Sequence, residues 1–168
     1  MRKTVKICEL ISEWSGLVAM WFSFFLVLLL TFEVFMRYIL ERPTIFTYEI
    51  SMMIGVTIAT MGLAFTHKYN GHVRVDVLWR LLSPKGQAIA DIVSALLFFF
   101  PLVIILTWVS VEWTQWALSV KEILTQSYLY PPAWPIRFVM ALGYLLFIPQ
   151  GIAKFIRDLH LVKRGIKL

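Results

Sequence analysis

Four long stretches without Asp, Glu, Lys, Arg or His divide this sequence of 168 residues. They lie between Glu13 and Glu33, Glu49 and His67, Asp91 and Glu112, and Arg137 and Lys154, with 19, 17, 20 and 16 residues respectively. An α-helix needs about 20 residues to cross roughly 30 Å of hydrocarbon, so we expect the second and fourth helices to extend past their bounding charges. The stretches are continuous rather than alternating and are too long for barrel strands, which predicts helices.

The composition agrees with a location in a membrane. Hydrophobic residues make up 60% of the chain and charged residues 15%, whereas soluble domains carry about 25% charge. We therefore predict an all-α integral membrane protein, a single membrane domain over residues 1–168 with four transmembrane helices. The expected spans are approximately 14–38, 46–67, 87–112 and 134–157. The first apolar stretch is too long for a signal peptide and has no small-residue cleavage pattern, which predicts an uncleaved anchor helix.

The distribution of Lys and Arg predicts the orientation of the helices. Twelve basic residues fall on one side: Arg2, Lys3, Lys6, Lys68, Arg74, Arg80, Lys85, Lys154, Arg157, Lys163, Arg164 and Lys167. The other side has Arg37, Arg42, Lys121 and Arg137. Both termini should therefore be cytoplasmic, and the lipid bilayer is the expected surroundings. The net charge of +6 is explained by these basic flanks, and no nucleic-acid partner is expected.

The connection between the second and third spans has an amphipathic pattern. Asp76 and Arg80 are four residues apart on one helical line, while apolar residues occupy the other side. This predicts an interfacial helix over about residues 73–83, lying flat on the cytoplasmic surface. Ser83 and Pro84 then resemble an N-cap and a first helical residue. Prolines at positions 101 and 149 predict kinks in the third and fourth spans.

Charged residues near the ends of the first two spans are the clearest candidates for a functional site. Glu33 and Arg37 are four apart and can pair along one helix face, and Glu49 begins the second span. One interpretation is an ion-pair cluster that fixes the packing of these spans, and we favour it because coupling carboxylates usually lie near the membrane midplane. The alternative is a proton or ion site.

Two further patterns predict contacts with neighbours. Ser51, Gly55, Ala59 and Gly62 are small residues three or four apart, which allow another helix of this chain or of a second chain to approach. The connection between the third and fourth spans is rich in aromatic residues: Trp113, Trp116, Tyr128, Tyr130 and Trp134. These predict an anchoring belt at the membrane surface or a docking surface for a partner.

Recognisable reaction chemistry is missing from the sequence. Cys8 is the single cysteine, and the three histidines lie at helix ends or in loops rather than facing each other within spans. We find no catalytic or phosphate-binding motif, so we expect neither an enzyme nor a cofactor. The span centres also lack the interruptions and charges that carriers commonly use, which favours a helper subunit over a complete transporter.

The order of several residues along the chain resembles that of a known protein family. Arg37-Tyr38, Pro43 and Glu49 are followed by Gly62 and then by the run Asn70-Gly71-His72-Val73-Arg74-Val75-Asp76. Their order and the four-span layout resemble the small membrane (Q-type) subunit of tripartite ATP-independent periplasmic (TRAP) transporters. The resemblance covers nearly the whole chain.

The resemblance implies a role and partners. It implies a bacterial inner-membrane complex in which a large membrane subunit carries the substrate and sodium sites and a periplasmic solute-binding protein captures the solute. The complex would import organic acids with an ion gradient, and this chain would be its scaffold. Arg37 and Glu49 would then be packing or partner contacts, and His72, Arg74 and Asp76 would organise the cytoplasmic turn.

Two other functions remain open from the residues alone. A small homodimeric proton-coupled exporter would use Glu33 or Glu49 as its coupling acid. A membrane anchor for an oxidoreductase would need bound haem or quinone.

Overall fold

The computed structural model describes residues 2–69, 71, 81–126 and 129–164, and 83% of them are helical. The helices are α1 (Arg2–Tyr38), α2 (Thr47–Lys68), α4 (Pro84–Ser94), the π-helix η1 (Ala95–Phe99), α5 (Phe100–Ser119) and α6 (Trp134–Arg164). Within these residues the β-structure is a single isolated bridge between Ile123 and Pro132. The predicted all-α fold is confirmed.

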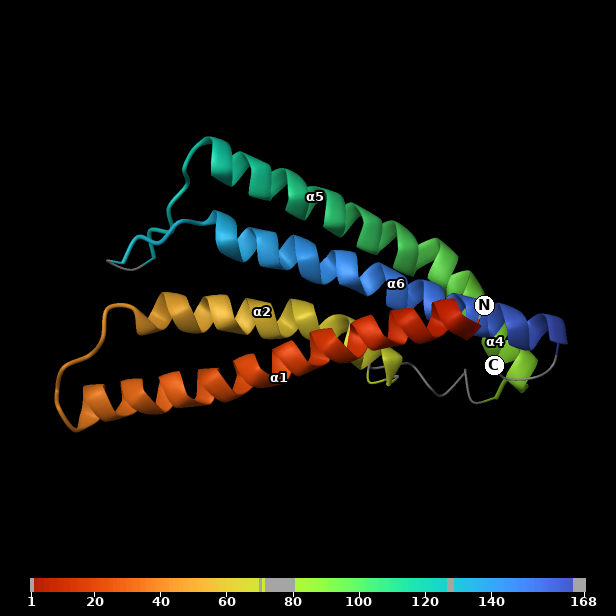
Figure 1. Ribbon diagram of the computed structural model, residues 1–168, viewed down its shortest axis with the longest axis horizontal. Helices are drawn as coiled ribbons and strands as arrows, with labels where there is room; N and C mark the ends of the chain where they lie inside the picture. Colours follow the sequence, from red (N-terminus) through yellow and green to blue (C-terminus); the bar gives the residue numbers. More distant parts are fainter. Residues whose placement is uncertain (1, 70, 72–80, 127–128, 165–168) are drawn as a thin grey trace.

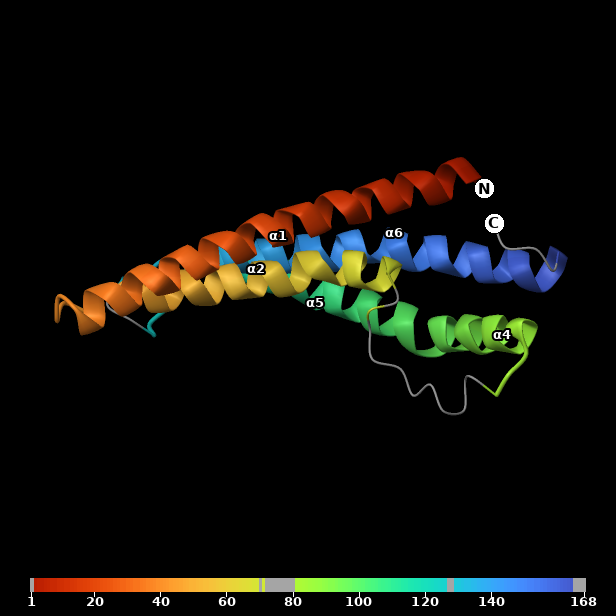
Figure 2. The ribbon, with the colours of Figure 1, turned by 90° about the horizontal axis from the view of Figure 1, so that it is seen from below.

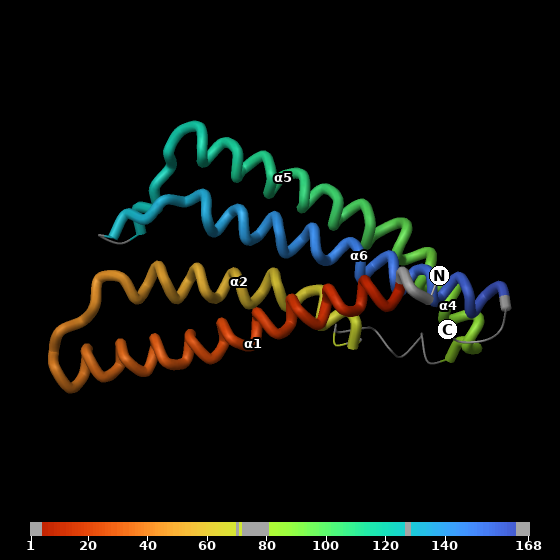
Figure 3. The backbone as a smooth tube through the Cα atoms, viewed as in Figure 1, coloured from red at the N-terminus to blue at the C-terminus, as the bar shows by residue number. Residues whose placement is uncertain are grey.

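The long helices lie side by side in the order α1, α2, α6, α5 (Figure 1). We call α1 and α2 the first hairpin, and α4, η1, α5 and α6 the second. The start of α1, the end of α6 and all of α4 lie at one end of the molecule, which we call the terminal end (Figure 3). Residues 39–46, between α1 and α2, and residues 120–126 and 129–133, between α5 and α6, lie at the other end, which we call the loop end. Helix α6 contacts α1, α2, α4, α5 and η1, and therefore organises the fold.

Four helical segments are long and apolar enough to cross a membrane: Val5–Tyr38, Thr47–Lys68, Pro84–Ser119 and Trp134–Lys163. Of the residues in the most apolar stretch of Pro84–Ser119, 6% are buried within the chain, compared with 33% for Trp134–Lys163. A turned view shows α1 on one side of α2 and α6, and α4 and α5 on the other side (Figure 2). The chain alone therefore leaves large apolar helix faces uncovered, as expected for helices that contact lipid or another membrane protein.

The start of the third span follows the predicted capping pattern. Ser83 Oγ accepts a hydrogen bond from the Gly86 N–H at 3.2 Å, and Pro84 occupies the first turn of α4. These two residues confirm the predicted N-cap. The predicted interfacial helix over 73–83 lies mostly outside the described residues, and its last three residues, 81–83, are not helical. Ser83 has an extended backbone because it caps the next helix.

A π-helix lies directly before the part of α5 that contains Pro101, where the sequence predicts a kink, and the kink itself stays a prediction. The five residues Ala95–Phe99 adopt this wider helix directly before α5, which has Pro101 in its first turn. Proline has no N–H and its ring crowds the preceding turn, so the hydrogen-bond pattern changes there. Helix α6 is continuous through Pro149, and a kink at that residue stays a prediction.

Small residues let the two hairpins approach closely. A Cβ atom added at Gly143 of α6 would lie 2.6 Å from Thr60 Cβ and 2.8 Å from the Thr60 carbonyl carbon on α2. Within the first hairpin, Gly16 of α1 packs in the same way against the ring of Phe65. Most buried apolar residues are alanines: Ala19, Ala64, Ala88, Ala117, Ala133, Ala141 and Ala153. Close backbone approach, rather than large side chains, therefore holds these helices together.

Candidate functional site: helix-joining contacts and an open helix face

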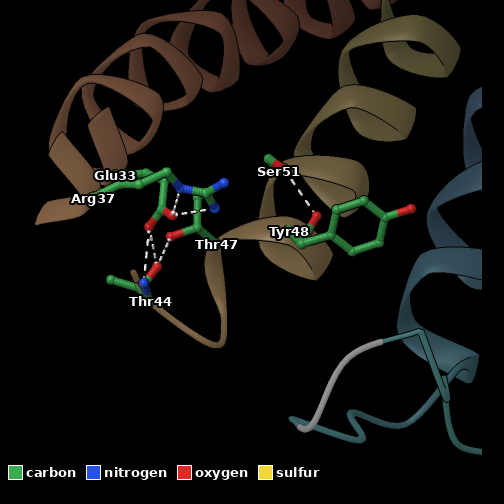
Figure 4. A network of polar contacts seen from close by, with 6 residues as sticks. All are labelled: Glu33, Arg37, Thr44, Thr47, Tyr48 and Ser51. Carbon is green, nitrogen blue, oxygen red and sulfur yellow. Dashed lines mark hydrogen bonds and ion pairs between the residues drawn. The ribbon is translucent and has the colours of Figure 1, made fainter. Parts of the chain in front are cut away.

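A polar network closes the loop end of the first hairpin (Figure 4). The Glu33 carboxylate accepts hydrogen bonds from Arg37 Nη2 at 2.6 Å and Nε at 3.0 Å, which confirms the predicted pairing of these residues. It also accepts from the Thr44 amide at 3.2 Å and from the Thr44 hydroxyl, which in turn contacts the Thr47 hydroxyl. The network connects the last turn of α1 to the first turn of α2 and holds the connecting loop between them.

Glu49 lies in the first turn of α2 and is completely buried. A negative charge in the first turn of a helix is stabilised by the unpaired N–H groups there and by the helix dipole. The Glu33 carboxylate accepts four hydrogen bonds, from Arg37 of the same helix and from Thr44 of the loop. Glu49 lies on α2, whereas the Glu33–Arg37 ion pair lies within α1.

A second polar cluster closes the loop end of the second hairpin. Arg137 Nη2 of α6 pairs with Glu122 Oε1 at 2.6 Å, and Arg137 Nη1 donates to the Trp113 carbonyl of α5 at 3.3 Å. The guanidinium also lies over two indole rings, 5.2 Å from the Trp113 centroid and 5.5 Å from that of Trp116. One cation thus joins α6 to α5 and to the loop that follows α5.

The terminal half of the molecule contains contacts between the two hairpins. Ser12 of α1 donates to Gln150 Oε1 of α6 at 2.8 Å, and both residues are almost completely buried. One helical turn closer to the N-terminus, Glu9 forms an ion pair with Arg157. These contacts join the N-terminal half of α1 to the C-terminal half of α6.

Two further ion pairs join helices within each hairpin at the terminal end. Glu13 Oε1 accepts from Lys68 Nζ and from the Tyr69 hydroxyl, each at 2.6 Å. The hydrogen bond to Glu13 raises the pKa of Tyr69 because it stabilises the protonated phenol. Lys154 of α6 pairs with Asp91 of α4 at 2.7 Å. Each pair crosses between helices that are distant in sequence.

The small-residue stripe on α2 is largely unused within the chain. A Cβ atom added at Gly55 or Gly62 would have no heavy atom within 4 Å in the described structure. Ala59, between them, is exposed. The glycines that bring helices together inside the chain are instead Gly16, Gly143 and Gly151. The face of α2 with Ser51, Gly55, Ala59 and Gly62, which we call the open α2 face, is thus available to a neighbour.

Some sequence candidates cannot be placed. His72, Arg74 and Asp76 lie outside the described residues. Within the residues that are described, no group of three His, Cys, Asp or Glu residues is close enough to hold a metal ion.

Sequence reasoning missed most of the interhelical contacts. Gln150 could have been noticed, because it is a polar residue inside an apolar stretch. Ser12 and Ser15 are three residues apart on one helix face, and both are buried in the structure. Thr44 and Thr47 carried less signal, since threonine is common in loops and at the start of helices. The ion pairs could not be assigned, because the sequence contains many acidic and basic residues near helix ends and does not specify which of them meet.

The comparisons with known proteins agree with this architecture. The family described as "Tripartite ATP-independent periplasmic transporters, DctQ component" matches residues 26–161, which cover most of the chain. The chain belongs to the DctQ family. It is therefore the small membrane subunit of a TRAP transporter and a multi-pass membrane protein. DctQ is a transporter component and not an enzyme family, and it implies association with the large DctM subunit and a binding protein. A search of curated proteins finds no match.

Proposed function

We propose that this DctQ-family chain is a scaffold that holds the large transport subunit in the membrane and helps the periplasmic solute-binding protein to dock. The complex would import organic acids with an ion gradient, with sodium as the coupling ion. The observation that supports this role most directly is which parts of the molecule the polar side chains connect. The long-range polar contacts join helices of this chain to one another, whereas the lateral helix faces are apolar and uncovered.

The open α2 face is the proposed contact for a helix of the large subunit. In lipid, apolar side chains gain little by leaving the hydrocarbon, so helices associate where small residues permit close backbone contact. Gly55 and Gly62 provide such positions, and the chain does not fill them. Glu33 and Arg37 hold the connection between α1 and α2, and Glu49 is buried in the first turn of α2, so the three would act as positioning residues for this contact.

The loop over residues 39–46 is the proposed contact for the binding protein. Ile39, Leu40 and Ile45 are exposed there, with 66%, 48% and 60% of their surfaces accessible. The bonds from Thr44 to Glu33 fix this loop before a partner arrives, which lowers the entropy cost of binding. The proposal places this end at the periplasmic side of a bacterial inner membrane, with both termini cytoplasmic. A reporter fused after Leu168 should then be active in the cytoplasm, and activity outside would contradict the orientation.

Co-purification tests the scaffold. The chain, tagged and expressed with the large subunit, should recover that subunit, and Gly55→Leu should reduce recovery at least about fivefold because its side chain fills the close-contact position. Ser94→Leu is the matched control, since Ser94 is an exposed small residue of the second hairpin. Equal recovery with both variants would contradict the proposed contact on α2.

Transport assays separate the scaffold from an autonomous carrier. Vesicles that contain this chain alone should take up no organic acid, while vesicles with the large subunit, binding protein and a sodium gradient should do so. C4-dicarboxylates, keto acids and sialic acid form the substrate panel. Uptake or proton-coupled export by the chain alone, abolished by Glu33→Gln or Glu49→Gln with assembly intact, would overturn the proposal in favour of the homodimeric exporter.

A further inference from the structure

A hollow at the loop end of the second hairpin combines charged and aromatic groups. It has a volume of about 510 Å³ and is lined by Val109, Glu112, Trp113 and Trp116 of α5 and by Arg137 of α6. Trp113 and Trp116 are each about half exposed, so the indole rings form an open wall. We propose that this hollow binds the phosphoethanolamine head group of a membrane phospholipid.

The depth of the hollow fits a lipid head group. The continuous helical segment Pro84–Ser119 has 36 residues and a length of about 54 Å, so a segment centred on 30 Å of hydrocarbon extends about 12 Å beyond it at each end. Glu112 lies seven residues before Ser119, which is about 10 Å along the axis. The hollow is therefore at the boundary between hydrocarbon and head groups, where tryptophan is favoured.

The charges favour a zwitterionic head group over an anionic one. Arg137 is paired with Glu122, whereas Glu112 makes no hydrogen bond or ion pair within the described part of the chain. Two carboxylates and one guanidinium give the cluster a net charge of about −1 at neutral pH. An additional anion alone would be repelled, whereas a zwitterionic head group adds no net charge and can place its ammonium beside the Glu112 carboxylate and its phosphate beside the Arg137 guanidinium.

The donors and acceptors favour ethanolamine over choline. Arg137 uses two of its five N–H groups for Glu122 and the Trp113 carbonyl, which leaves donors for a phosphate. A primary ammonium donates hydrogen bonds to the Glu112 carboxylate, whereas a quaternary ammonium cannot. Choline is commonly held between aromatic rings, and here the guanidinium of Arg137 already lies over Trp113 and Trp116.

Native mass spectrometry of the full chain tests this site. The chain is released from mixed micelles that contain equal amounts of phosphatidylethanolamine, phosphatidylglycerol and phosphatidylcholine with the same acyl chains. We expect the ethanolamine lipid to be retained about fivefold over the others, and Glu112→Gln to reduce this preference about threefold or more. Glu41→Gln, an exposed acid of the other loop, is the matched control and should behave like the unchanged chain.

A second variant and a competitor complete the test. Arg137→Lys keeps a positive charge for Glu122 but removes the planar group over the indoles, and should also lower ethanolamine lipid retention. Soluble phosphoethanolamine at the same concentration should not displace the lipid. An unchanged preference in Glu112→Gln, a preference for phosphatidylglycerol, or displacement by the soluble head group would each overturn the proposal.

Discussion

The polar contacts at the two ends of the molecule join different parts of the chain. At the loop end, Arg37 and Thr44 bind Glu33 from 4 and 11 residues away, and Arg137 binds Glu122 from 15 residues away. In the terminal half, Gln150 binds Ser12 across 138 residues. The loop-end contacts stabilise each hairpin separately, whereas the terminal half contains both contacts within each hairpin and the contacts that join the two hairpins. We therefore expect substitutions at the loop end to affect one hairpin, and substitutions of the contacts between hairpins to affect both.

The largest effect is expected where the hairpins cross. Gly143→Leu would place a side chain against the backbone of Thr60 and force α2 and α6 apart. We expect a loss of about 3 kcal/mol in the free energy of unfolding, measured by denaturant titration of the purified chain in mixed micelles. The control is Gly55→Leu, whose side chain faces open space and should cost less than about 0.5 kcal/mol. Equal losses would show that α2 and α6 do not cross at Gly143.

A smaller effect is expected from the buried contact between α1 and α6. Gln150→Leu removes the acceptor of the Ser12 hydroxyl and should cost about 1 to 2 kcal/mol. Hydrogen exchange should increase in the terminal half of α1, because that part would lose its link to α6. Ser23→Ala serves as control, since the Ser23 hydroxyl bonds within its own helix to Ala19. Faster hydrogen exchange in the loop over residues 39–46 as well would contradict the idea that the loop-end contacts are independent of those between α1 and α6.

Glu33→Ala should act locally. It removes the four hydrogen bonds from Arg37 and Thr44, and Arg37 has 55% of its side chain exposed, so its charge remains hydrated. We expect a loss of about 1 kcal/mol and rapid hydrogen exchange at the Thr44 amide, with α6 unchanged. Thr31→Val, which affects an exposed hydroxyl bonded to Val27 of the same helix, should leave that amide protected.

The smallest effect is expected at Lys68. The Lys68→Gln substitution removes a partly exposed ion pair with Glu13 while the Tyr69 hydroxyl still donates to that carboxylate. The cost should be about 0.5 kcal/mol at low ionic strength and should disappear in about 1 M salt, because exposed charges are screened. Titration of unfolding at both salt concentrations measures this difference. A cost that persists in high salt would place this ion pair among the buried contacts.

Local sequence signals predicted the helices because their causes are local. Ser83 and Pro84 start α4 through a cap that involves three neighbouring residues, and the Glu33–Arg37 pair follows from one helical turn. Pro101 indicated where the third span departs from a regular α-helix, but it did not predict a π-helix. The altered hydrogen bonding covers the five residues Ala95–Phe99, which precede the proline.

Contacts between hairpins could not be predicted in the same way. Small-residue spacing on α2 pointed to Gly55 and Gly62. The glycines of other helices that meet α2 inside the described structure are instead Gly143 of α6 and Gly16 of α1. Spacing identifies a face that permits close approach, and it does not identify the helix that approaches. The same limit applies to Gln150, which is a visible polar residue whose partner lies at the other end of the sequence.

By itself the sequence determined four membrane-crossing helices, because hydrocarbon excludes charged side chains and requires each span to satisfy its own backbone. Order and spacing of a few residues also identified the family. Only the tertiary structure decided that α6 contacts each of the other helices in the described part of the chain, that Ser12 meets Gln150, and that Gly55 is left open. These facts depend on how helices pack against one another, and lipid-facing and helix-facing apolar residues look alike along the chain.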